Sequence, residues 1–93
     1  MILLFLASTT VFAQRITITG TVTDEGGSPL VGTTVLIKGT TMGAITDANG
    51  KYSIDVDNRN VTLVFSFIGF ITQEVAAQNQ AVVDVILKAE ITG

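Results

Sequence analysis

Cysteine, histidine and tryptophan are absent from this sequence of 93 residues, and Pro29 is its single proline. Without cysteine the chain has no disulfide bond and no thiolate nucleophile, and without histidine it has no imidazole base and few ways to hold zinc. Five lysines and arginines stand against eight aspartates and glutamates, for a net charge of −3. Because the basic residues are few and scattered, they form no positive stripe for a phosphate backbone. We therefore expect neither thiol or imidazole catalysis nor a nucleic-acid partner.

Helical periodicity is also missing, and a period of two takes its place. In the segment RITITGTVTD, Ile16, Ile18 and Val22 share one face while threonines occupy the other. Such alternation is typical of a strand with one face on a core and one in water. Gly20 interrupts the inward row, which indicates a bulge or a close backbone approach.

Similar alternating segments, separated by turns, account for most of the chain. A chain of this length forms one small domain, and its pattern predicts an all-β fold, a small antiparallel seven-stranded β-sandwich. The expected strands lie within residues 15–24, 33–39, 43–46, 51–56, 61–67, 71–75 and 82–88. Beyond the first strand, the side chains expected to face inward are Val35, Ile37, Tyr52, Ile54, Val56, Val61, Leu63, Phe65, Phe67, Val83, Val85 and Leu87.

The first residues differ in kind from the rest. Residues 2–6 form a continuous apolar run, small residues follow, and Ala13 precedes Gln14 as at the cleavage site of a secretory signal peptide. The run is too short to span a bilayer, which takes roughly 20 apolar residues. We interpret residues 1–13 as an export signal and residues 14–93 as the mature domain. The basic n-region is missing, which a start codon placed downstream of the true one explains; the alternative is a hydrophobic first strand.

The segment TDANGKYSIDV contains the most suggestive oxygen ligands, Asp47 and Asn49, followed by Gly50. An EF-hand loop needs oxygen ligands at positions 1, 3 and 5, glycine at 6 and glutamate at 12. With Gly50 at position 6, position 1 is Ile45 and position 12 is Val56, so both ends of the loop fail. The residues instead predict a tight turn at a hairpin corner, because Asp and Asn hydrogen-bond their own backbone and Asn-Gly favours positive φ.

A calcium site outside the EF-hand class stays open as an alternative. If the strands alternate in direction, the turn at Asp24 and Glu25 falls at the same end of the sandwich as Asp47 and Asn49, where their oxygens can gather. Acidic side chains also cluster at solvated sandwich ends without metal, so we expect no cofactor and no metal. No spacing of lysine with serine, or of paired carboxylates, indicates a catalytic group, and we expect no enzyme.

Three stretches carry a resemblance to a known family: GTVTDEGGSPLVGTTVLIKGT, GAITDANGKYSI and FSFIGF. The chain resembles, over residues 16–88, the carboxypeptidase-regulatory-like domain at the N-terminus of the SusC/RagA group of TonB-dependent outer-membrane receptors of Bacteroidetes. The resemblance implies a transthyretin-like (prealbumin-like) seven-stranded sandwich. It also implies a non-catalytic domain on the periplasmic side of the outer membrane, ahead of a plug and β-barrel that import glycans or other nutrients.

Partners follow from the same resemblance. They are the plug and barrel of the same receptor and TonB, with a SusD-like lipoprotein reached only through the full receptor. The sequence shows no TonB box, plug or barrel up to Gly93. The chain is therefore expected to be a fragment of a receptor; the alternative is a free-standing secreted adhesive or ligand-binding β-sandwich, associated with calcium at its acidic end.

Overall fold

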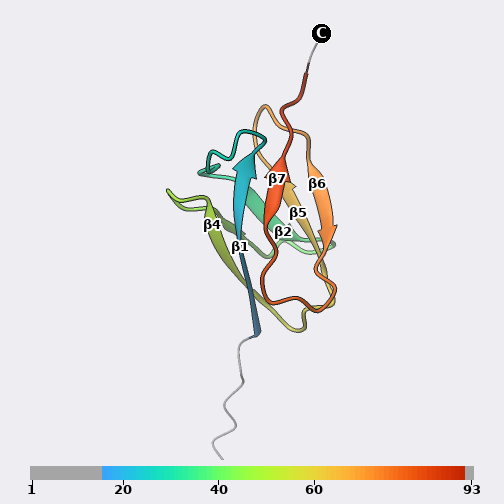
Figure 1. The fold of residues 1–93 in the computed structure, drawn as a ribbon. Helices are drawn as coiled ribbons and strands as arrows, with labels where there is room; N and C mark the ends of the chain where they lie inside the picture. The colour runs from blue at the N-terminus through green and yellow to red at the C-terminus, as the bar shows by residue number, and fades with distance from the viewer. Residues whose placement is uncertain (1–15, 92–93) are drawn as a thin grey trace, which may run out of the picture.

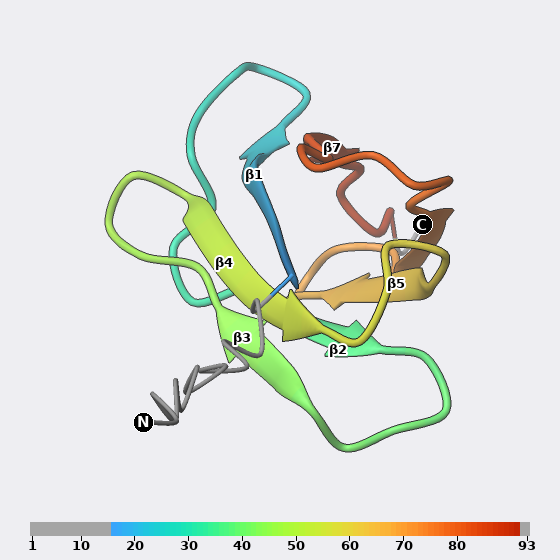
Figure 2. The ribbon, with the colours of Figure 1, turned by 90° about the horizontal axis from the view of Figure 1, so that it is seen from below.

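The computed structural model describes residues 16–91, which form seven strands in two sheets packed face to face (Figures 1 and 2). The described residues contain no helix and thus none long and apolar enough to cross a membrane. The predicted export signal, residues 1–13, lies outside the described residues. The strands are β1 (Ile16–Asp24), β2 (Thr34–Ile37), β3 (Gly43–Ile45), β4 (Lys51–Val56), β5 (Thr62–Ser66), β6 (Gln73–Ala76) and β7 (Val85–Leu87).

One sheet has the strand order β4-β1-β7 and the other the order β3-β2-β5-β6. The predicted seven-stranded β-sandwich is confirmed, with one correction to its antiparallel character. β1 pairs with β7 in parallel, from Val22 opposite Val85 to Asp24 opposite Leu87, whereas the other ladders are antiparallel. The reason is simple: strands that alternate strictly in direction place the first and the seventh in the same direction, so these two are parallel once they become neighbours.

The core lies between the two sheets and follows the predicted inward rows closely. On β4, buried Tyr52, Ile54 and Val56 alternate with exposed residues. The Tyr52 ring makes an edge-to-face contact with the Phe65 ring of the opposite sheet. The ring centroids are 5.5 Å apart and the interplanar angle is 72°, a favourable aromatic geometry. The buried apolar residues are Ile18, Val22, Leu30, Val35, Tyr52, Ile54, Val56, Leu63, Phe65, Ala77, Val83, Val85 and Leu87.

Gly20 marks a close backbone approach rather than a bulge. The β1–β4 register runs through it without interruption, with Gly20 opposite Tyr52. A Cβ at this position would lie 1.9 Å from the carbonyl oxygen of Val83 and 2.8 Å from the Tyr52 ring. The Tyr52 hydroxyl donates a hydrogen bond to that carbonyl, and the Thr21 N–H is accepted by Oδ1 of Asp84 at 2.8 Å. A glycine in this strand thus lets the Tyr52 side chain pass over β1 to Val83, in the segment before β7 of the same sheet.

Candidate functional site

Two acidic loops lie at the same end of the sandwich. One follows β1 and begins at Asp24; the other connects β3 to β4 and begins at Asp47. Because β1 and β4 are antiparallel and Thr21 lies opposite Lys51, the end of β1 lies beside the start of β4 (Figure 1). The Val22 N–H donates to the Gly50 carbonyl at 2.8 Å, which joins the second loop to β1.

The Asp47 loop is organised by its own aspartate. Oδ1 of Asp47 accepts the backbone N–H groups of Asn49 and Lys51, both at 2.9 Å. The Asp47 carbonyl accepts the Gly50 N–H, and the Asp47 N–H donates to the Lys51 carbonyl, again at 2.9 Å. Gly50 has a φ of +73°, a conformation that side chains with a Cβ avoid. Asp47, Asn49 and Gly50 therefore form a turn in which Asn49 contributes its backbone.

The Asp24 loop repeats this pattern. Oδ1 of Asp24 accepts the N–H groups of Gly26 and Ser28 at 2.9 Å. The Asp24 carbonyl accepts the Gly27 N–H at 3.0 Å, the Asp24 N–H donates to the Ser28 carbonyl at 2.9 Å, and Gly27 has a φ of +85°. Each aspartate thus commits one carboxylate oxygen to the backbone of its own loop.

The Asp47 turn is a corner between the sheets, and the expected hairpin is wrong. β3 belongs to the four-stranded sheet and β4 to the three-stranded one, so no ladder extends beyond the turn. The physical reason is that each strand has a better partner elsewhere. Ile45 pairs with Thr34 on β2, and Tyr52 pairs with Gly20 on β1.

The oxygens considered for calcium share this end of the sandwich without forming a cluster. Glu25 and Asn49 are exposed, and the aspartates Asp24 and Asp47 each serve their own loop. Within residues 16–91, no group of three or more acidic, histidine or cysteine side chains is placed to hold a metal ion. What the two loops provide is a hydrogen-bonded corner on which Glu25 and Asp47 are exposed.

Two buried threonines, which the alternation did not single out, tie the two loops together. Thr33 and Thr46 are 0% and 4% exposed. The Thr46 hydroxyl donates to the Leu30 carbonyl and accepts the Thr33 N–H at 2.8 Å, while the Thr33 hydroxyl also reaches the Leu30 carbonyl. Thr33 lies in the inward row of Val35 and Ile37, so the alternation contains a signal for its burial. The signal for Thr46 is weak, because a threonine beside a strand usually faces water.

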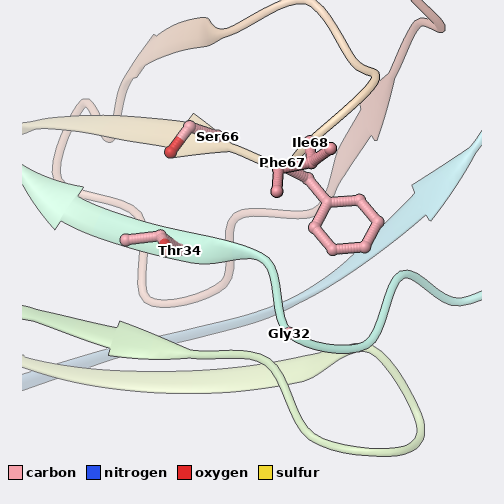
Figure 3. A pocket seen from close by; sticks show the side chains of 5 residues that line it. All are labelled: Gly32, Thr34, Ser66, Phe67 and Ile68. Atoms are coloured by element: carbon pink, nitrogen blue, oxygen red, sulfur yellow. The ribbon is translucent and has the colours of Figure 1, made fainter.

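An open cavity of about 420 Å³ lies where the segment before β2 meets the segment after β5. Figure 3 shows the Phe67 ring turned toward the backbone around Gly32, with Ile68 beside it. Phe67, expected to face inward, is only half-buried because it follows the last residue of β5, and it packs on Phe70 with ring centroids 5.7 Å apart. The lining residues are Gly32, Thr34, Ser66, Phe67 and Ile68.

Residues 18–92 match the family model of the CarboxypepD_reg-like domain, which is most of the chain. The chain belongs to this family. This match, together with 38–43% identity to TonB-dependent receptors that include SusC, confirms the predicted resemblance to the carboxypeptidase-regulatory-like domain of SusC-type receptors.

Similar segments occur in much larger proteins. The chain is 43% identical over 74 residues to a TonB-dependent receptor of Formosa agariphila, covering 80% of this chain and 7% of the receptor. It is 43% identical over 77 residues to the TonB-dependent receptor SusC of Bacteroides thetaiotaomicron, covering 83% of this chain and 7% of SusC. A second Formosa agariphila receptor is 38% identical over 88 residues, covering 94% of this chain and 9% of that receptor. The chain therefore spans less than a tenth of the length of these relatives.

Among solved structures, this CarboxypepD_reg-like domain is similar to a chain of a type II cohesin-X-dockerin complex from Acetivibrio cellulolyticus. The TM-score is 0.57 with 32% sequence identity, covering 77% of this chain and 51% of the other. The likeness extends over most of the described sandwich.

Proposed function

We propose that this CarboxypepD_reg-like domain is a non-catalytic accessory domain of a SusC-like TonB-dependent receptor, located on the periplasmic side of the outer membrane. The observation that carries the proposal is the 38–43% identity to three TonB-dependent receptors over 80–94% of this chain. Since the chain covers 7–9% of those receptors, import itself is assigned to the rest of such a receptor.

The site chemistry supports a role in interaction. The two acidic loops use their aspartates to shape the backbone. The described surface presents exposed apolar side chains, among them Ile45 and Ile68. A sandwich whose loops are held by internal hydrogen bonds and whose surface exposes apolar side chains is suited to contact other protein segments. The proposed partners are the plug and barrel of the same receptor and TonB, with a SusD-like lipoprotein contacted through the full receptor.

The test begins with the gene. We expect the reading frame after Gly93 to continue into a plug and a barrel. In the native host, deletion of residues 14–93 from that receptor should slow growth on the receptor's nutrient while the receptor still fractionates with the outer membrane. The matched control is the same strain carrying the undeleted gene.

Two results would contradict the proposal. A stop codon directly after Gly93, together with the free domain in culture supernatant, would establish a free-standing secreted module. Unchanged growth of the deletion strain would show that the domain has no accessory role in import.

A further inference from the structure

We infer that the outer edge of β3, which has no ladder partner among residues 16–91, and the uncharged surface beside it form a docking site for an extended, uncharged segment of a partner polypeptide, which adds to the four-stranded sheet as a fifth strand. The partner's place in a receptor rests on the function proposed above. The docking geometry itself rests on the described residues alone.

The backbone of β3 presents hydrogen-bonding groups on its outer side. Ile37 N–H donates to the Met42 carbonyl and Thr46 N–H donates to the Thr33 carbonyl, both at 3.0 Å. In an antiparallel ladder, hydrogen-bonded pairs alternate with pairs whose N–H and C=O groups point the other way. Gly43 and Ile45 occupy these alternate positions, so their N–H and C=O groups point away from β2, toward the open edge. Only an extended segment offers partners at the matching spacing.

Charge distinguishes this edge from the other three. Edge strands are normally guarded by charged residues, bulges or covering segments. Residues 39–46, which contain β3, include no charged side chain and no proline. The other edges carry or adjoin charge: Lys51 and Asp55 on β4, Glu74 on β6, and Asp84 and Lys88 beside β7.

The opposite margin of the sandwich is also covered by the chain itself. The segment between β5 and β6 runs along the residues after β7, where Ile71 N–H donates to the Lys88 carbonyl and Glu90 N–H donates to the Gly69 carbonyl, both at 2.9 Å. On β6, the Glu74 carboxylate is paired with Lys38 at 2.9 Å. β3 has only β2 as a ladder neighbour among the described strands.

The side chains around the β3 edge fit an uncharged occupant. Ile45 is 68% exposed and Met42 is 62% exposed. An open cavity of about 240 Å³ is lined by residues of β2 and β3 and by Thr41 between them. It shares Thr34 with the cavity of Figure 3, whose lining residue Ile68 is 94% exposed. Both linings are free of charge. A charged strand would lose its hydration here without gaining a partner, so an uncharged strand is favoured.

A second copy of this chain is a poor occupant. β3 has three residues, which at about 3.3 Å per residue make a ladder of roughly 10 Å. A stable dimer buries at least about 1,200 Å², more than so short an edge supplies. A short strand contact becomes effective when the partner segment is held nearby, because tethering raises its effective concentration.

The test uses the 93-residue chain and a defined probe, the acetylated and amidated peptide Thr-Val-Thr-Val-Thr. In NMR titrations we expect saturable shifts of the Gly43 and Ile45 amides, with exchange of the Gly43 amide slowed by about tenfold at saturation. Ile45→Pro removes an N–H that β2 does not use, so the fold should persist while binding is lost.

The matched control is Ala76→Pro on the β6 edge. Ala77 N–H donates to the Val61 carbonyl, so the N–H of Ala76 also points away from its neighbouring strand. This variant should bind the peptide like the unmodified chain. Equal shifts along β6, binding that survives Ile45→Pro, or no saturable shift at millimolar peptide would overturn the inference.

One further outcome decides against the proposed occupant. Protection of Gly43 that rises with protein concentration in the absence of peptide would make a second copy the occupant. A stop codon after Gly93 would remove the receptor proposal and leave these peptide measurements standing, so the two failures are distinguishable.

Discussion

The two aspartate loops have the same internal hydrogen bonds but different surroundings. In each, one carboxylate oxygen accepts two backbone N–H groups and a glycine follows with positive φ. A Cβ on Gly27 would meet nothing within 4 Å, whereas a Cβ on Gly50 would lie 2.6 Å from the Val22 carbonyl and 3.0 Å from the Pro29 side chain. The same local motif is therefore a surface turn in one place and a packed corner in the other.

Val22 explains the difference. Its N–H donates to the Gly50 carbonyl, and its carbonyl accepts the Leu30 N–H at 2.9 Å. The chain after the Asp24 loop folds back along β1 and covers Gly50, while the tip of that loop stays in water. Hydrogen bonds within a loop set its shape, and the elements packed on it set how much the fold depends on it.

Alanine in place of Gly27 or Gly50 should give the largest difference in stability between the two loops, because only Gly50 is packed against other elements. Gly50→Ala combines a strained φ, about 1 kcal/mol, with overpacking against Val22 and Pro29, about 2 kcal/mol. Gly27→Ala carries the first cost alone. We expect losses in unfolding free energy of about 3 and about 1 kcal/mol, measured by urea denaturation. Equal losses in unfolding free energy for the two variants would show that packing against Gly50 does not contribute to stability.

Tyr52 lies next to the Asp47 loop and should make the stability of this part of the fold depend on pH. Burial raises the pKa of Tyr52, and the nearby Asp84 carboxylate raises it further. Folding thus favours the neutral hydroxyl, so its contribution is complete below the ordinary tyrosine pKa of about 10 and is lost as the pH rises beyond it. We expect the free energy of unfolding to fall above about pH 10. As the pH rises, the backbone amides of the Asp47 loop should lose protection from hydrogen exchange at a lower pH than those of the Asp24 loop.

Tyr52→Phe is the matched variant, since Tyr52 is the only tyrosine. It removes the hydrogen bond to the Val83 carbonyl and should cost about 2 kcal/mol at neutral pH. It should also flatten the stability profile above about pH 10, the ordinary tyrosine pKa. A profile as steep as that of the unmodified chain would assign the alkaline loss to other groups.

Substitution of Asp24 or Asp47 tests the feature that the two loops share, a carboxylate that accepts two backbone N–H groups. Asp47→Ala and Asp24→Ala each remove two hydrogen bonds to exposed backbone, and we expect a loss of about 1 kcal/mol for either. Asn at the same positions retains an oxygen acceptor and should restore part of the loss. Thermal unfolding of the four variants measures this. A much larger loss for Asp47→Ala would mean that packing, as well as shape, depends on its carboxylate.

Local patterns predict what is local in this fold. The alternation in KYSIDV matches the burial of Tyr52, Ile54 and Val56, because facing a core with every second residue is a property of the strand itself. The division of β3 and β4 between sheets is not local, since it depends on β1 and β2 as better partners. The burial of Thr46 is not local either, because its hydroxyl donates a hydrogen bond to the Leu30 carbonyl, 16 residues earlier in the chain.

Whether a strand lies at the edge of a sheet likewise depends on the whole sheet. Residues 43–46 were predicted as a strand, and β3 is there. Nothing in those residues alone distinguishes a central strand from an edge strand. What the sequence does contain is the lack of charge between Gly39 and Thr46, which acquires meaning only once β3 is known to have a single neighbour.

Calcium should have the smallest effect on stability. A large effect would mean that the two loops cannot be treated as separate turns. Because each aspartate commits an oxygen to its own loop and the described residues bring no third acidic group to them, we expect no change in the midpoint of thermal unfolding in millimolar Ca²⁺. Magnesium at the same concentration is the control for ionic strength. An upward shift with Ca²⁺ alone, abolished in both Asp24→Ala and Asp47→Ala, would mean that the two loops act together as one site.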